Sequence, residues 1–539
     1  MYSPEPQSIT FSTLINDIDK GIIKIPQFQR DFVWSIEESA KLIDSIIKGY
    51  PIGTFILWES QEKLRSVRNI GGADLPDTPL GSMVQYVLDG QQRMTSLYAS
   101  LKGLQIQREK GSDDFSEIYV DLVASDEDSI IITNIEDRNA TEVISLRNLL
   151  HGGIPVLMEY PKTMYQKLDE YKNRLQTYRF STILLRGASI DIATEVFTRL
   201  NVGGKSLTVF EIMVAKTYDD SQKFDLSQKY EELIARLEQV GYETIPDITV
   251  LQTISVILVR ECTRKNILKL DKQKFIDIWD DVIDAIERSI EYFRNYYRIP
   301  VSKILPYNAL IVPFSYFFYN HPDKPVNDIK NYLDDFFWRV SLSERYSSST
   351  ETKLAQDIKK IDLILHGELP RYEFQVETSK DFIINNGGFS ANRSFIKAIL
   401  CLMAYQEPKS FNDNSIVRMN NDWLKQANSR NYHHFFPRAY LKKQGEDEFY
   451  INHIVNITIV DDFLNKRRIR AQAPSKYMAT FQQENKALLR TMKTHLIDDL
   501  NSYGIWDDNY DAFFDCRAQK ISNELTKRII QQPVGILKN

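Results

Sequence analysis

The 539-residue sequence has little cysteine and no long apolar run. Its three cysteines, Cys262, Cys401 and Cys516, are odd in number and far apart, which excludes a disulfide framework and a structural zinc site. Even an apolar stretch such as residues 309–319 is shorter than the ~20 residues needed to cross a bilayer. The first residues also lack the basic start and apolar run of a signal peptide. We therefore expect a cytoplasmic protein with reduced thiols and no membrane partner.

A surplus of positive charge is also absent. The chain carries 67 Lys and Arg residues against 73 Asp and Glu residues, a formal net charge of −6. Such a chain cannot coat nucleic acid or a membrane by bulk attraction to phosphate, so any contact with DNA must be local. Hydrophobic residues at 43% and charged residues at 26% are typical of globular proteins. At roughly 100–200 residues per domain, the length predicts about three domains.

The composition of local segments predicts three parts of different character. Residues 1–220 read as mixed α/β, residues 221–406 as a helical domain with long amphipathic segments, and residues 407–539 as a small α+β module among helices. A polar stretch at residues 407–414 marks the start of the third part. Strands are predicted at residues 21–25, 53–58, 83–88, 118–123, 180–185 and 454–460, and helices at 36–48, 230–240, 274–297, 329–343 and 486–500.

Histidine is scarce, with seven in the chain, yet His433 and His434 are adjacent and are followed by Phe435-Phe436-Pro437. This pattern suits the edge of a β-hairpin, where successive side chains point to opposite faces and the proline ends the pairing. Asn456 lies in the apolar run of residues 454–460, where an amide without a partner is costly. Asn465 then opens a basic segment that contains Lys466, Arg467, Arg468 and Arg470.

These residue types fit the hydrolysis of a phosphodiester. The reaction needs a base to deprotonate water and a cation to stabilise charge on the phosphate, and imidazole and amide groups can supply and hold them. The order His-His, Asn, Asn resembles the HNH (ββα-metal) nucleases. That resemblance implies that His434 is the general base, that His433 and Asn465 bind Mg²⁺ or Mn²⁺, and that Asn456 orients His434 or its loop. The first residue of the pair is often Asp in that family, so His433 leaves the ligand set and the activity of the site open.

A structural reading of the same residues stays open as well. His433 and His434 can be ordinary half-buried residues, and Asn456 can be a buried amide that caps a turn. The basic cluster can be a solvated face, although beside a nuclease site Lys466, Arg467, Arg468 and Arg470 are placed for phosphate contacts.

A second set of motifs lies near the N-terminus. In the segment Leu88-Asp89-Gly90-Gln91-Gln92-Arg93, a strand leads into a helix whose first N–H groups and positive dipole end favour an anion. Arg93 could add a bidentate contact to phosphate, and the two glutamines could position a water. Neither a Walker-type loop nor a dinucleotide-binding glycine pattern is present. In the competing structural reading, Asp89 caps the helix, Arg30 and Arg93 form salt bridges, and Gly203-Gly204 is a plain turn.

The motifs IPQFQRDFVW, LDGQQRMTSLY and FTRLNVGGKSLTVFEI, ahead of an HNH-like tail, resemble the GmrSD-type modification-dependent (type IV) restriction enzymes. The resemblance covers the first two hundred residues and about the last hundred. It implies a ParB/sulfiredoxin-like (DUF262-like) N-terminal domain that binds and hydrolyses GTP or ATP, and a DUF1524-like HNH domain that cuts DNA. Carried across, the nucleotide-site candidates are Gln29, Arg30, Asp89, Gln91, Gln92, Arg93, Arg199 and Asn201, with Asp89 and Gln92 as candidates to polarise the attacking water.

The leading hypothesis is an NTP-regulated, metal-dependent endonuclease that acts in defence against phage or modified foreign DNA. A homodimer would suit it, because two active sites can cut two strands. One alternative is a nucleotide-dependent DNA-binding or scaffold protein with an inactive HNH-like tail. Another is a phosphohydrolase whose main active site is in the N-terminal domain.

Overall fold

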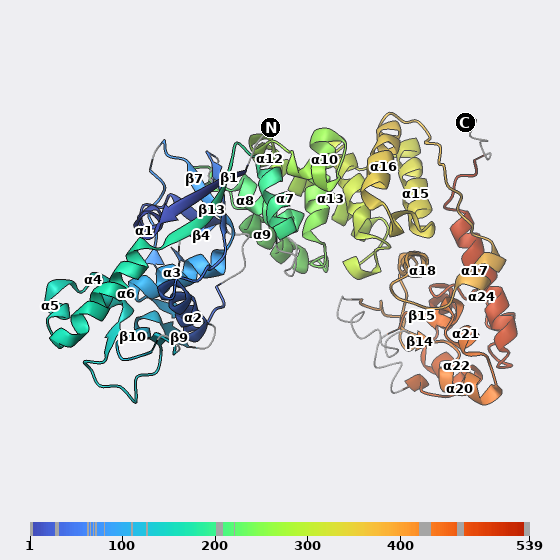
Figure 1. Cartoon of the computed structure of the whole chain (residues 1–539). Coiled ribbons are helices and arrows are strands. Elements are labelled where there is room, and N and C mark those ends of the chain that lie inside the picture. The colour runs from blue at the N-terminus through green and yellow to red at the C-terminus, as the bar shows by residue number, and fades with distance from the viewer. Residues whose placement is uncertain are drawn as a thin grey trace. The chain divides into compact units, whose positions relative to one another are not determined.

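The computed structural model describes residues 4–26, 32–61, 64, 66–67, 69–70, 73–79, 81–108, 111–125, 128–200, 208–219, 221–419, 433–460 and 468–532. The chain divides into two compact units, Met1–Leu226 and Ser227–Asn539, shown in blue to green and in green to red in Figure 1. The change from mixed α/β structure to helices occurs where these units meet in the sequence. No helix in the described ranges is long and apolar enough to cross a membrane.

The N-terminal unit is built on a mixed sheet of six strands in the order β1-β13-β3-β7-β2-β4. Its central strands are β13 (Arg179–Arg186), which pairs parallel with β3 (Phe55–Ser60), and β7 (Val84–Asp89), which pairs antiparallel with β3. Buried and exposed residues alternate along β13, the period expected of a strand with one face in the core. The outer strands are β1 (Pro4–Thr10), β2 (Ile23–Pro26) and β4 (Ser66–Val67). Pro4 and Pro6 are tolerated because β1 lies at an edge.

Helices bury their apolar stripes against this sheet in one hydrophobic core. The core includes Leu14 of α1 (Phe11–Asp19), Ile43 of α2 (Ile36–Ile47), Leu97 of α3 (Gln91–Lys102) and Leu175 of α6 (Tyr165–Thr177). Helix α2 starts at a capping box, in which Ser35 and Glu38 each accept the other's backbone N–H. A smaller sheet has the order β11-β10-β12 and contains Ile131–Ile132, Tyr119–Asp121 and Val143–Ser145.

The unit ends in helices α7 (Ile190–Leu200) and α8 (Val209–Thr217). The strands predicted at residues 21–25, 53–58, 83–88, 118–123 and 180–185 correspond to β2, β3, β7, β10 and β13.

The second unit begins with helices arranged around α14 (Ile311–Asn320), which is buried on nearly all sides. This helix packs against α10 (Asp247–Val259), α13 (Trp279–Asn295) and α16 (Thr350–Leu365), as a helix that is apolar all round requires. Helices α9 (Leu226–Glu238) and α15 (Asn327–Leu342) match the predicted segments at 230–240 and 329–343. The single helix predicted at 274–297 is instead two, α12 (Lys272–Asp277) and α13, and Asp280 and Asp281 in the first turn of α13 favour a new helix start.

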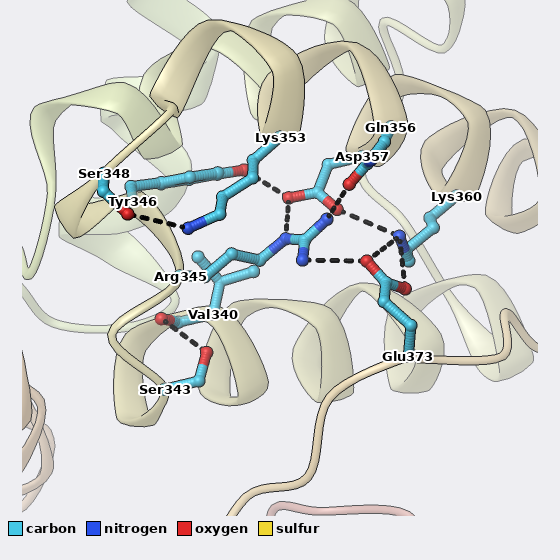
Figure 2. Close-up of polar contacts among 10 residues, drawn as sticks. All are labelled: Val340, Ser343, Arg345, Tyr346, Ser348, Lys353, Gln356, Asp357, Lys360 and Glu373. Carbon is cyan, nitrogen blue, oxygen red and sulfur yellow. Dashed lines mark hydrogen bonds and ion pairs between the residues drawn. The ribbon is translucent and has the colours of Figure 1, made fainter.

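A buried polar network joins α16 to the segment that follows it, as Figure 2 shows. Asp357 is fully buried and bonds the Arg345 Nε (2.7 Å), the Lys360 Nζ (3.2 Å) and the Tyr346 hydroxyl (2.7 Å). Glu373 reaches the same two cations from the following segment, at 2.8 Å from Arg345 and 3.1 Å from Lys360. Each buried charge therefore has opposite charges around it, the condition under which such a network is stable.

The C-terminal part of this unit contains β14 (His433–His434) and β15 (Ile457–Thr458) among helices. These helices are α17 (Lys380–Asn386), α18 (Ser394–Tyr405), α20 (Arg438–Gln444), α21 (Glu448–Ile451), α22 (Pro474–Glu484), α23 (Leu488–Lys493) and α24 (Tyr510–Thr526). The helix predicted at 486–500 is shorter than expected, since α23 ends at Lys493.

Residues beyond α24 return to the helical part of the unit. The backbone N–H of Ile530 donates to Asp335 (2.7 Å), and its carbonyl accepts from the Arg339 guanidinium (2.5 Å). Asp335 and Arg339 form a buried ion pair on α15. Together they bind the backbone N–H and the backbone carbonyl of Ile530, which lies almost two hundred positions later in the sequence. This C-terminal clamp, Asp335 and Arg339 on Ile530, fixes the end of the described chain to α15.

Candidate functional site

The adjacent histidines lie on a short antiparallel strand pair, as their sequence predicts. His433 is opposite Thr458, and His434 is opposite Ile457. The predicted strand at 454–460 is shorter in the structure, because residues Ile454–Asn456 form a 3₁₀ turn before β15. The sequence also predicts a helix that carries Asn465 after this strand pair, and that position lies outside the described residues.

Asn456 fixes the turn that follows the histidine pair. Its fully buried side chain accepts a hydrogen bond from the Phe436 N–H (2.9 Å) and donates to the carbonyls of Phe436 (3.0 Å) and Ile451 (3.1 Å). The amide is therefore satisfied in its buried position. The geometry agrees with the predicted role in orienting the loop of His434, and equally with a buried amide that holds a turn. In both readings, Asn456 holds the backbone beside His434.

His434 is the half-buried member of the pair. Its Nε2 lies 3.0 Å from the Asn452 Oδ1. Burial lowers the pKa of His434 to about 4, although the hydrogen bond to Asn452 acts in the opposite direction. The ring is therefore neutral near pH 7, the state in which an imidazole can accept a proton from water.

His433 points into the core. Its side chain is 2% exposed, lies edge-on to the rings of Phe411 and Tyr477, and has its Nδ1 2.9 Å from the Thr458 hydroxyl. Burial holds the pKa of His433 well below its ordinary value. The Nε2 atom is buried and has no hydrogen-bond partner among the described residues. One ring nitrogen fixed by a partner and the other left free is the usual arrangement of a metal-binding imidazole.

The structure thus fits His433 as one ligand, but it does not complete a metal site. The second predicted ligand, Asn465, lies outside the described residues. Within the described ranges there is no group of three or more His, Cys, Asp or Glu side chains that could hold a metal ion. Any ion bound by His433 would therefore take most of its remaining ligands from water, substrate or residues outside the described ranges.

Arg517, a residue that the sequence did not single out, supports the strand pair from within the core. It is fully buried on α24, and its Nη1 donates to the carbonyls of Val455 and Ile457 (2.7 Å to the latter), the residues on either side of Asn456. Its Nε donates to the His495 carbonyl (3.1 Å). Burial lowers the pKa of Arg517 to about 9. The segment that carries Asn456 is therefore held by a second element.

The predicted DNA-binding residues differ in how freely they are presented. Arg468 forms an ion pair with Glu484 (2.6 Å) and lies over the Phe481 ring, so its charge is already paired within the protein. Arg470 is exposed and has no ion-pair partner among the residues described. Lys466 and Arg467 lie outside the described residues.

Glu448 contacts three polar side chains near His434. It forms ion pairs with Arg438 and Lys442 (3.0 Å), and it accepts a hydrogen bond from the Asn452 Nδ2 (2.6 Å). Contacts with Lys442, Asn452 and Arg438 lower the pKa of Glu448 to about 2 from its ordinary 4.5. Glu448 is thus a carboxylate at every physiological pH.

This shift predicts a pH-dependent contribution to stability. Because the folded-state pKa is depressed, the contribution is present above the unfolded value near 4.5 and is lost as pH falls toward 2. In urea unfolding, Glu448→Gln should be less stable than the wild type at pH 6, and the difference should shrink below about pH 4.5 and disappear only as pH approaches 2. Glu446→Gln is the control, because its contact is a backbone N–H of Asp447. A difference between wild type and Glu448→Gln that stays constant with pH would contradict the assigned ion pairs.

The N-terminal motif forms a tight turn between β7 and α3. Gly90 is the N-cap of α3 with φ 92°, and a Cβ at this position would lie 2.5 Å from the Phe55 ring. A glycine is therefore required here. Asp89 does not cap the helix, so this part of the structural reading is wrong. One of its carboxylate oxygens instead accepts from Arg93 (3.2 Å), the salt bridge that the same reading predicted for Arg93. Arg93 also donates to the carbonyls of Ile52 (2.7 Å) and Thr54 (3.1 Å), so its guanidinium already holds this turn together.

The other nucleotide-site candidates are only partly brought together. Gln91 and Gln92 are buried, and the Gln92 side chain accepts from the Val33 N–H (2.9 Å) and donates to the side-chain Oε1 of Gln91 (2.7 Å). Arg199 is 78% exposed and pairs with Glu195 (2.6 Å) rather than with the Asp89 turn. Gln29, Arg30 and Asn201 lie outside the described residues. Of the two residues predicted to polarise water, Asp89 at 37% exposure is the more accessible.

Comparison with known proteins supports the resemblance for the N-terminal unit. Residues 11–218 match the family model of the GmrSD restriction endonuclease N-terminal domain. This part of the chain, which contains five of the six strands of the large sheet and the Asp89–Arg93 turn, is therefore similar to the N-terminal domain of restriction enzymes.

A second similarity covers the whole chain. An uncharacterised protein of Methanocaldococcus jannaschii is 24% identical, over 96% of this chain and 98% of its own length. The two proteins are thus similar across both compact units, including the residues that follow the match to the restriction enzyme domain.

Proposed function

We propose that this protein is a metal-dependent DNA endonuclease of a defence system against phage or modified foreign DNA, with His434 as the general base. The observation that carries the proposal is the geometry around His434. A neutral, half-buried imidazole lies at the end of a two-stranded hairpin, next to a turn that the buried amide of Asn456 holds. The match of residues 11–218 to a restriction endonuclease domain supports DNA as the substrate.

The chemistry follows from these groups. His434 takes a proton from a water molecule, the resulting hydroxide bonds to phosphorus, and the bond from phosphorus to the leaving sugar oxygen breaks. That oxygen takes a proton from solvent. A bound divalent cation would stabilise the negative charge on the phosphate, and His433 and Asn465 are the residues proposed to hold it. Arg470, Lys466 and Arg467 are proposed to contact the DNA backbone, because exposed arginines and lysines position phosphates.

The N-terminal unit is proposed to bind a nucleoside triphosphate at the start of α3 and to restrain the nuclease until DNA is recognised. Gly90 leaves the helix start without a side-chain cap, and Asp89 and Arg93 lie within its first turn or next to it. Phosphate bound here would compete with Asp89 for the Arg93 guanidinium, which gives the nucleotide a means of changing the turn that Arg93 holds. Gln29, Arg30, Gln91, Gln92, Arg199 and Asn201 complete the proposed set.

The test is cleavage of supercoiled plasmid by the full chain. We expect nicking with Mg²⁺ or Mn²⁺ that EDTA abolishes, with a rate that depends on GTP or ATP and on whether the DNA carries modified bases. The incomplete ligand set around His433 favours a second function, DNA binding without cleavage. Tight binding with no nicking under any metal, nucleotide or DNA modification would support that second function and reject the endonuclease.

A further inference from the structure

Asn452 is the residue that contacts the proposed base, and no motif pointed to it. It follows α21, and its backbone is fixed from both sides: its N–H donates to the Glu448 carbonyl (3.0 Å), and its own carbonyl accepts from the Phe389 N–H (2.8 Å). Its side chain lies between two groups, with the amide nitrogen on Glu448 (2.6 Å) and the amide oxygen toward His434 Nε2 (3.0 Å).

The charge of Glu448 decides which way this amide faces. An ionised carboxylate can only accept hydrogen bonds, so the group that Asn452 presents to Glu448 must be its NH₂. The contacts of Arg438 and Lys442 with Glu448 keep the carboxylate ionised and in place. The Asn452 oxygen is consequently left to face His434, and an oxygen can only accept. The nitrogen of His434 that meets it must therefore carry the hydrogen.

We propose that Asn452 and Glu448 are positioning residues that hold the hydrogen of His434 on Nε2 and leave Nδ1 as the atom that takes the proton from water. A neutral imidazole carries one N–H, so a hydrogen on Nε2 makes Nδ1 the lone-pair nitrogen. Among the described residues, no hydrogen bond to His434 Nδ1 is formed. The inference rests on the proposed nuclease function for the role of Nδ1, but the position of the hydrogen can be measured without cleavage.

The first measurement is ring-nitrogen NMR of the full chain labelled with ¹⁵N-histidine, at pH 7.5 and without DNA. The signals of His434 are identified by their loss in His434→Gln. We expect a protonated Nε2 and an unprotonated Nδ1 in the wild type. Asn452→Ala should give a mixture of the two tautomers, and Asn523→Ala, an exposed asparagine on α24, should behave as the wild type. A hydrogen on Nδ1 in the wild type, or an unchanged ring in Asn452→Ala, would overturn the inference.

The second measurement is single-turnover nicking with the same variants. We expect Asn452→Ala to be slower by about 10- to 100-fold with an unchanged DNA affinity, the usual cost of losing a group that orients an imidazole. Glu448→Gln, whose amide can donate or accept, should allow Asn452 to turn and should slow nicking as well.

These results separate the inference from the proposed function. Nicking that persists in His434→Ala would reject His434 as the base while the ring-nitrogen result still stands. Full nicking in Asn452→Ala together with loss of nicking in His434→Ala would reject the positioning role alone.

Discussion

Replacement of His434 by alanine is expected to reduce DNA nicking by about 10²- to 10⁴-fold, the range that a general base contributes. The side chain is half-buried, and its described hydrogen bond is to Asn452, so its removal takes away one neutral contact and the proton acceptor. Binding of DNA should change little, because the imidazole is uncharged near pH 7. The loss should therefore appear in the rate of the chemical step rather than in the affinity.

The measurement is single-turnover nicking of supercoiled plasmid with saturating protein. His366→Ala is the matched control, since His366 is an exposed histidine of the same unit whose ring contacts the Asp362 carbonyl. Thermal unfolding of both variants shows whether the fold is retained. A His434→Ala protein that is folded and still nicks at the rate of the control would remove His434 from the mechanism.

Replacement of Asp357 by alanine is expected to destabilise the second unit by about 3–5 kcal/mol, the cost of breaking a buried ion pair from one side. Arg345 and Lys360 have side chains only 5% and 9% exposed, so both cations would stay buried with Glu373 as their remaining carboxylate. Tyr346 would also lose its acceptor. Such a loss is a large part of the free energy of unfolding of an ordinary domain.

Urea unfolding followed by circular dichroism measures this effect. Asp284→Ala is the control, because it removes an ion-paired carboxylate that is 60% exposed on α13 and should change stability by less than about 1 kcal/mol. Asp357→Asn should fall between the two, since its amide oxygen can still accept hydrogen bonds from one of the cations. Equal stability of Asp357→Ala and Asp284→Ala would show that the network of Figure 2 does not hold the segment around Glu373.

The parts of the fold that the sequence predicted are those with strong local patterns. Strands such as β13 alternate buried and exposed residues, and helices such as α15 repeat their apolar residues with helical spacing. Strands β11 and β12 of the small sheet, two and three residues long, were not predicted because they carry too few residues to show a period. The break before α13 was missed for a similar reason, because an apolar stripe continues on either side of Ile278.

In the candidate site as well, residues with an unusual local pattern could be predicted from the sequence, whereas residues that act through tertiary contacts could not. His433, His434 and Asn456 stood out because imidazole and a buried amide are unusual where they occur. Asn452 and Glu448 did not stand out, because an asparagine four residues after a glutamate is a common spacing around a short helix. Arg517 acts on Val455 and Ile457 from a helix sixty positions later, and Arg93 uses its guanidinium on the Ile52 and Thr54 carbonyls. Contacts of this kind exist only once the chain has folded.

The C-terminal clamp limits how early the second unit can complete its folding while the chain is being synthesised. Asp335 and Arg339 belong to a helix that is made well before the groups that satisfy them, the N–H and carbonyl of Ile530, which are synthesised almost two hundred residues later. Until then the helical part of the second unit carries an ion pair without its final partners. Completion of that unit therefore waits until Ile530 has been made, when the segment bearing His434 has already emerged.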